Sequence, residues 1–246
     1  VTCTGTTSGT YTIRNVQNVQ LTNEGAWNLS GTSLGIVNAD TGNLTDLVVT
    51  NKGTMTWDDA RYGGGGTGSR AAINVYTTGN TATKATTING RTGTINLNVL
   101  TSSGAKQSLI GMALSAQGSD SRAFWTNDGQ INVESAVDDQ SGSFVTAGAA
   151  LGRTQVEVVN TGNVNVNQPS GTSSVTGILS FLRGGSTVPA SAIVTNSGNI
   201  RVVSPNARSM GLWLGQSAAN LNNNASVLKL NNTGTIQLDT DPAKGV

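Results

Sequence analysis

An acidic pair beside a glycine-rich loop is the strongest catalytic candidate in the sequence. Asp58 and Asp59 follow Trp57 directly and precede Arg61 and Tyr62. Paired carboxylates act as general acid and base in glycoside cleavage, so a polysaccharide lyase or hydrolase with a groove near Asp58, Asp59 and Arg61 is one hypothesis. Adjacent residues on a strand point to opposite faces, so the pair alone does not aim both carboxylates at one bond. We therefore favour solvated acids in a turn, and we retain Asp58, Asp59 and Arg61 as candidate binding residues.

Other catalytic groups are missing from the sequence. It contains no histidine, which excludes Ser-His-Asp triads and the common zinc sites. Cys3 is the single cysteine, so the chain has no internal disulfide and no cysteine-based metal cluster. We expect no enzyme activity, no metal site and no cofactor.

Aromatic residues make up 4% of the chain, so their placement is informative. The alternation of a strand places three of the tryptophans inward, in the core: Trp27, Trp57 and Trp125. The candidate binding aromatics, which we expect to point outward, are Tyr62, Tyr76, Phe181 and Trp213. Exposed aromatics can stack on sugars or fill a pocket of a partner.

Charge excludes two classes of partner. Only 11% of the residues are charged, and the formal net charge is +1, so no broad field attracts nucleic acid or an anionic membrane. The polar residues are mainly Thr, Asn, Ser and Gly, which suit turns and strands better than helices. No apolar stretch reaches the ~18 residues that cross a bilayer as a helix.

A recurring turn, Asn-X-Gly-X-Φ-X-Φ with Φ a large apolar residue, organises the whole chain. Its Asn and Gly positions are Asn23 and Gly25, Asn51 and Gly53, Asn127 and Gly129, Asn160 and Gly162, Asn196 and Gly198, and Asn232 and Gly234. A weaker copy ends at Gly93, with Arg91 in place of the Asn. Successive glycines are 28 to 40 residues apart, a period typical of stacked repeat proteins.

Each repeat divides into three short segments with the alternation of a strand. Apolar residues lie two and four positions before the Asn, and again two and four positions after the Gly. A third segment begins with a small residue, as in Gly111-Met112, Gly148-Ala149, Gly177-Ile178 and Gly211-Leu212; earlier copies are Gly35-Ile36-Val37 and 71–75. We predict an all-β fold, a right-handed parallel β-helix of about seven coils with three short strands per coil.

The Asn-X-Gly turn has a physical role in such a coil. We expect Gly to supply a positive φ between the first two strands, and the Asn side chains of successive coils to hydrogen-bond along the stack. The alternative is a series of antiparallel hairpins, but hairpin turns recur every 8–12 residues, a much shorter period.

The repeats carry a family resemblance. The segments Val194 to Ile200, Val158 to Val164 and Leu230 to Ile236, alternating with Gly-Ile, Gly-Leu and Gly-Met segments, resemble passenger domains of bacterial autotransporters, which use the type V secretion route. The resemblance covers essentially the whole chain. It implies a cell-surface or secreted location outside the bacterial outer membrane, with residues 1–246 forming one β-helical segment, the N-terminal part of a longer chain that a further domain anchors.

Together these features predict a non-catalytic surface adhesin for host attachment, cell–cell aggregation or biofilm formation, with a role in virulence. The expected partner is a host-cell surface protein, extracellular matrix, a glycan, or the same passenger on another cell. Two alternatives stay open: the polysaccharide lyase or hydrolase described above, and a passive stalk whose functional region lies further along the chain.

Overall fold

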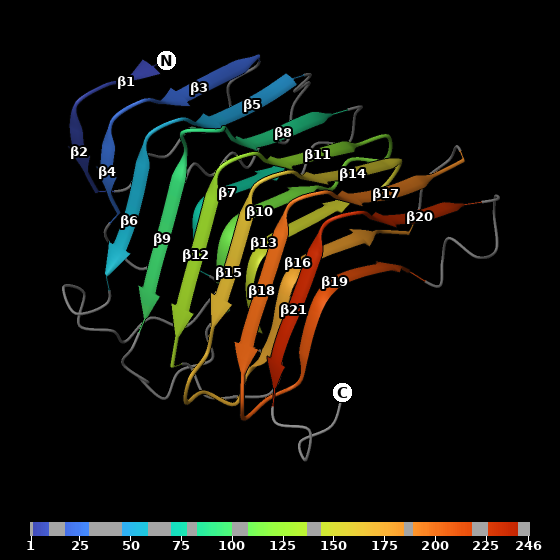
Figure 1. The fold of residues 1–246 in the computed structure, drawn as a ribbon. Coiled ribbons are helices and arrows are strands. Elements are labelled where there is room, and N and C mark those ends of the chain that lie inside the picture. The colour runs from blue at the N-terminus through green and yellow to red at the C-terminus, as the bar shows by residue number, and fades with distance from the viewer. Residues whose placement is uncertain are drawn as a thin grey trace.

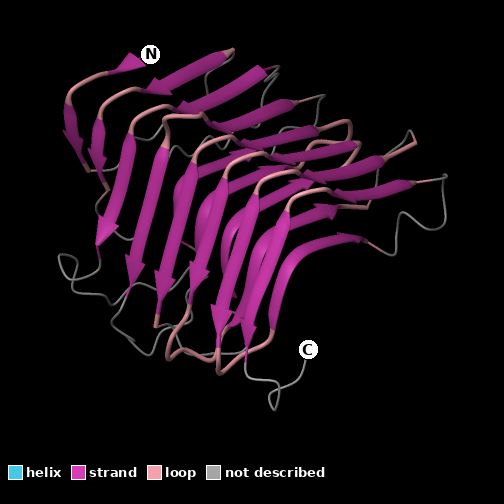
Figure 2. Cartoon of the chain, in the orientation of Figure 1, coloured by secondary structure: helices cyan, strands magenta, loops and turns pink. Residues whose placement is uncertain are grey.

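A computed structural model describes residues 2–9, 18–29, 46–58, 70–77, 83–99, 108–136, 144–184, 189–217 and 226–240. All regular structure in these residues is β-strand (Figure 2). No helix in the described part of the chain is long and apolar enough to span a membrane.

The strands form three parallel sheets, A, B and C (Figure 1). Sheet A contains, in spatial order, β1 (Thr2–Cys3), β3 (Val19–Asn23), β5 (Asp46–Asn51), β8 (Lys84–Asn89), β11 (Arg122–Asn127), β14 (Gln155–Asn160), β17 (Ser191–Asn196) and β20 (Val227–Asn232). Sheet B contains β2 (Thr6–Ser8), β4 (Ala26–Asn28), β6 (Thr54–Asp58), β9 (Thr94–Val99), β12 (Gln130–Ser135), β15 (Asn163–Asn167), β18 (Asn199–Ser204) and β21 (Thr235–Thr240). Sheet C contains β7 (Arg70–Thr77), β10 (Leu109–Ala116), β13 (Phe144–Gly152), β16 (Ser174–Leu182) and β19 (Ser209–Gln216).

This topology confirms the predicted parallel β-helix. Each strand pairs with its equivalent in the next coil, so every sheet runs along the length of the molecule (Figure 1). The number of coils differs from the expected seven, because sheets A and B each contain eight strands and sheet C contains five described ones. The additional coil is the first: Cys3 pairs with Asn23, and Thr6 with Ala26, so Cys3-Thr4-Gly5 occupies the place of an Asn-X-Gly turn.

The core consists of the inward residues that the alternation predicts. Apolar side chains from all three sheets form one continuous buried cluster along the stack. Trp27, Trp57 and Trp125 are 2%, 0% and 1% exposed, which confirms their placement inside. In the last described coil, Leu228, Leu230 and Leu238 occupy the same inward columns but are exposed, since no further described coil covers them.

The Asn ladder is confirmed, and it includes a residue that the motif missed. Side-chain amides of successive coils bond one to the next over distances of 2.6–2.9 Å, through Asn23, Asn51, Asn89, Asn127, Asn160, Asn196 and Asn232. Asn89, not Arg91, is the ladder residue of the weak repeat, because β8 pairs Asn89 with Asn51 and Asn127. The turn from Asn89 to Gly93 is two residues longer than the other turns, so the Asn-X-Gly motif does not match there.

The expected reason for the turn glycines is wrong. Among the described glycines only Gly5 and Gly9 have positive φ, so the glycines of the later turns are not in the left-handed region. They are required by close stacking instead. A Cβ on Gly162 would overlap the carbonyl oxygen of Gly129, and one on Gly198 would overlap that of Gly162.

The strands of sheet C curve, whereas those of sheets A and B meet at the Asn turns as two flatter faces (Figure 1). A column of small residues crosses these strands, beginning at Ala72 and continuing through Gly111, Ala147, Gly177 and Gly211. A Cβ on Gly177 would meet the carbonyl of Gly211 and the side chain of Ile200, so larger residues do not fit.

The sequence alignment of the third segment was correct for three copies and wrong for one. Gly111, Gly177 and Gly211 share a column, but Gly148 pairs with Met112 and Ile178, one position further along. Gly148 has a separate role, because a Cβ there would overlap the indole of Trp125. The segment 71–75 lies in β7 as expected, and Gly35-Ile36-Val37 lies outside the described residues.

Candidate binding groove

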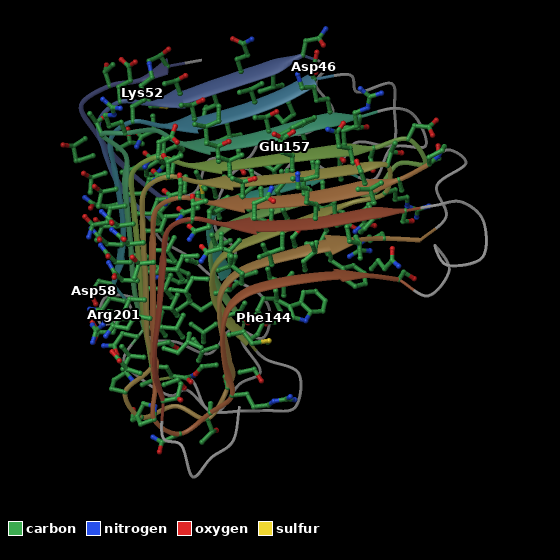
Figure 3. All side chains as sticks on the ribbon, turned by 45° about the vertical axis from the view of Figure 1, so that its right-hand side comes forward. Asp46, Lys52, Asp58, Phe144, Glu157 and Arg201 are labelled. Atoms are coloured by element: carbon green, nitrogen blue, oxygen red, sulfur yellow. The ribbon has the colours of Figure 1, made fainter. Side chains whose placement is uncertain are left out.

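A groove of about 510 Å³ lies on the outer, concave face of sheet C. Its lining comes from all five strands of the sheet and the residues just beyond them: Asn74, Tyr76, Ile110, Ala113, Leu114, Ser115, Gln117, Phe144, Ala149, Leu151, Leu179, Phe181, Arg183 and Trp213. Figure 3 shows Phe144 on this side of the molecule, away from Asp58 and Arg201 on sheet B. The volume is within the range of sites that bind small molecules or several side chains.

Strand register brings the lining residues together. One outward column of sheet C contains Tyr76, Ser115, Leu151, Phe181 and Gly215, each from a successive strand. The neighbouring outward column contains Asn74, Ala113, Ala149, Leu179 and Trp213. Residues far apart in the sequence therefore form two adjacent rows along the molecule.

The floor of the groove is a small apolar cluster separate from the main core. Ala71, Ile110 and Ala149 are buried at its centre, although they lie on the outer face of the sheet. Ala113, Phe144, Leu151 and Leu179 pack against them. Because sheet C is bent, outward side chains on either side of the bend approach one another and exclude water.

Two aromatic rings form one end of the groove. Phe181 of β16 and Trp213 of β19 stack with their centroids 5.7 Å apart and their planes inclined by 7°. Gly215 makes room for this stack, because a Cβ on it would overlap the Trp213 indole. The space that a side chain at position 215 would occupy is thus filled by the Trp213 ring from the neighbouring column. Tyr76 of β7 lies at the other end.

Polar groups are found at the rim, where the strands of sheet C end. Gln117 follows β10 and donates from Nε2 to Ser115 Oγ at 3.2 Å. Arg183 follows β16. Its backbone NH donates to the carbonyl of Gly152 at 2.7 Å, so Arg153, the residue after Gly152, lies next to Arg183 in the neighbouring coil. The Nε of Arg153 is buried without a hydrogen-bond partner in the described structure. Among the lining residues that the structure describes, no side chain is acidic.

The structure brings together three of the predicted site residues and separates a fourth. Tyr76, Phe181 and Trp213 all line the groove, as outward residues of sheet C. Asp58 is the last residue of β6 and lies on sheet B, away from the groove (Figure 3). Asp59, Arg61 and Tyr62 lie outside the described residues.

Several groove residues were not predicted, among them Phe144, Leu179 and Arg183. Phe144 begins β13, and its backbone NH donates to Ser108 Oγ of the preceding coil at 3.3 Å. Alternation within β16 would have placed Leu179 and Arg183 on the same face as Phe181. What was missing was the register of β13, since the sequence alignment of that strand was wrong by one residue.

Sheet B presents a different surface, flat and covered by amides. Asn132 donates to Asn96 at 2.8 Å and accepts from Asn165 at 3.0 Å, so a second, partly exposed ladder runs along its outer face. At the end of this face Arg201 pairs with Asp239 at 2.8 Å. Hydrogen bonds from Gln237 and then Arg201 lower the pKa of the Asp239 carboxyl below its usual value of 3.8.

No group of three or more His, Cys, Asp or Glu side chains that could hold a metal occurs in the part of the chain that the structure describes. Comparison of the chain with protein-family models, with curated proteins and with solved structures found no match.

Proposed function

We propose that this chain is a non-catalytic adhesin segment, displayed outside a bacterial outer membrane, that contacts its partner through the groove on sheet C. The observation that supports this function best is the convergence of Tyr76, Phe181 and Trp213 in one concave apolar groove. Exposed apolar and aromatic surface of this kind is typical of interaction sites. Catalysis is not required for the proposed role.

The β-helix supports this role by holding the contact residues rigidly. Every lining strand is hydrogen-bonded to a strand of an adjacent coil, so the backbone that carries the rings is held in place before a partner arrives. Preorganisation of this kind lowers the entropic cost of binding. Many copies displayed on one cell would add weak individual contacts into stable attachment. The candidate partners are a host-cell surface protein, extracellular matrix, a glycan or the same passenger on another cell.

Display of the chain on a non-adherent bacterium, fused to an outer-membrane anchor, tests the proposal. We expect the displayed chain to increase aggregation or attachment to host cells or matrix. The double variant Phe181→Ala with Trp213→Ala should remove most of that increase. Phe124→Ala is the matched control, because Phe124 is an outward aromatic on sheet A, away from the groove. Surface levels are measured with an antibody to the anchor.

Two results would contradict the proposal. The first is a displayed wild-type chain that leaves aggregation and attachment at the level of the anchor alone. The second is a groove variant that attaches as well as the wild type at equal surface level. The first result would favour the passive stalk.

A further inference from the structure

We infer that the groove takes a segment of a protein, bound through two or three apolar side chains next to a carboxylate, rather than a glycan. The inference rests on the proposed function, since it names the partner class for the same groove. It follows from the chemistry of the floor, from the orientation of the rings and from the charge at the rim.

The floor favours apolar side chains over sugars. Ile110, Ala113, Ala149, Leu151 and Leu179 offer no hydrogen-bonding side chain to a ligand. A sugar brings hydroxyl groups on most of its carbons, and each one that is buried without a partner costs about 1–3 kcal/mol. Aliphatic and aromatic side chains lose nothing comparable when they enter such a groove, and gain about 25 cal/mol per Å² of apolar surface buried.

Phe181 does not offer a flat face on which a sugar could stack. Sugars bind aromatic residues through the flat face of the ring, but Trp213 covers one face of Phe181, with the planes 7° from parallel. Leu151 is the neighbour of Phe181 on the other side, in the preceding strand. The edge of the Phe181 ring is therefore what remains for a ligand, and ring edges pack well against apolar side chains and other aromatic rings.

The length of the groove suits an extended segment. Tyr76 and Trp213 lie four strands apart, which corresponds to about 19 Å at the usual spacing of ~4.8 Å. Alternate side chains of an extended peptide are ~7 Å apart and point to one side. Three such side chains fit between the two aromatic ends, over the small residues Ala113, Ser115 and Ala149.

The rim favours a carboxylate at one end of that segment. Arg183 lines the groove just beyond the end of β16, and no acidic side chain is among the lining residues that the structure describes. Arg183 also interacts elsewhere within the chain, so the argument rests on the positive charge that it adds to this end of the groove. A carboxylate that meets a guanidinium makes a charge-assisted hydrogen bond, stronger than a neutral one. Asp120, in the turn after β10, reduces the positive charge nearby but is not among the lining residues.

Trp213 provides a direct probe. It is one of four tryptophans, and the other three are buried in the core. The purified chain, labelled with 5-fluorotryptophan, should give four ¹⁹F resonances, with that of Trp213 assigned from the Trp213→Phe variant. The test peptide is acetyl-Phe-Ser-Leu-Ser-Phe-Glu-amide, in which three apolar side chains alternate before a glutamate. The matched peptide has lysine in place of the glutamate, and the sugars are cellohexaose and chitohexaose.

The glutamate peptide should shift the Trp213 resonance alone, with a dissociation constant of about 0.1–1 mM. The lysine peptide should bind at least about fivefold more weakly, and Arg183→Gln should remove this difference. Ser115→Phe fills the middle of the groove, so it should weaken binding about tenfold or more while the thermal unfolding midpoint stays the same or rises.

The inference would be overturned if the sugars shifted Trp213 and the peptides did not, if neither did at millimolar concentration, or if Ser115→Phe left peptide binding unchanged. Equal binding of the two peptides would overturn the carboxylate part. These outcomes are distinct from failure of the proposed function: cells that attach through Phe181 and Trp213 while the peptides fail to bind would contradict only the choice of partner.

Discussion

Trp213 stacks on Phe181 across two adjacent coils, at a centroid distance of 5.7 Å, because Gly215 leaves its own place in the column open. The two residues occupy different columns of sheet C, since Phe181 pairs with Gly215 and Trp213 pairs with Leu179. The absence of a side chain at Gly215 therefore determines the shape of one end of the groove.

Loss of the stack should be visible in both stability and fluorescence. Phe181→Ala is expected to lower the free energy of unfolding by about 0.5–1.5 kcal/mol for the aromatic pair, in addition to the loss of buried area. The emission of Trp213 should shift to longer wavelength as its ring becomes more exposed. Urea unfolding and tryptophan emission spectra measure the two effects. Phe124→Ala, which removes the ring that Lys84 approaches on sheet A, should leave the Trp213 emission unchanged.

The turn glycines should be intolerant of any side chain. Gly162→Ala places a Cβ against the carbonyl of Gly129, so the two coils must separate locally. We expect a loss of about 1–3 kcal/mol, typical of overpacking, measured by urea unfolding. Gly90→Ala is the control, since its Cβ would lie 3.4 Å from the Asn51 carbonyl oxygen and 3.6 Å from Lys52 Cγ. Equal effects of the two variants would contradict the stacking explanation.

The buried Asn ladder should contribute more to stability than the exposed amides. Asn160 accepts from Asn127 at 2.8 Å and donates to Asn196 at 2.7 Å, and all three are fully buried. Asn160→Ala removes the acceptor 2.8 Å from the Asn127 amide and the donor to the buried Asn196 Oδ1, so we expect a loss of about 1–3 kcal/mol. Thermal and urea unfolding check this value. Asn199→Ala removes an exposed amide bond of 3.0 Å to Asn163 and should cost less than about 0.5 kcal/mol.

The acidity of Asp239 can be measured directly. The hydrogen bonds from Gln237 and Arg201 stabilise the charged carboxylate, so its pKa lies below 3.8 in the folded chain. Because the folded-state pKa is the lower one, this contribution to stability is present above pH 3.8 and is lost as the pH falls through the lowered value. Carbon-13 NMR titration of the carboxyl group should show the depressed pKa, and both Gln237→Ala and Arg201→Gln should raise it. A pKa unaffected by either variant would refute the assignment.

The fold could be predicted because the apolar alternation and the Asn-X-Gly period describe the contacts within and between coils. The ladder from Asn127 to Asn232 and the buried Trp125 follow from that period alone. The first coil was missed because Cys3 replaces the Asn, and the role of Asn89 was missed because its turn is longer. The conformational preference of glycine suggested a positive φ at these turns. Glycine is instead required there by the close contact between coils, which cannot be recognised from a single repeat.

The groove could be predicted only in part. Alternation within a strand placed Phe181 and Trp213 outside, and both lie there. Their proximity to Tyr76 and Phe144 depends on the register between strands of sheet C and on its bend. The segments that precede these strands vary in length, so the spacing of the turns does not fix that register. Pairing across coils, such as that of Leu151 with Phe181, is a property of the folded stack.

The side-chain amides of the ladder all donate in the same sense, from Asn23 to Asn51 and onward to Asn232. Their small dipoles therefore add along the axis rather than cancel, and the row has a hydrogen-accepting head and a hydrogen-donating tail. Two such rods placed tail to tail would oppose donor to donor, so any end-on assembly that continues the row must run head to tail, with every rod pointing the same way.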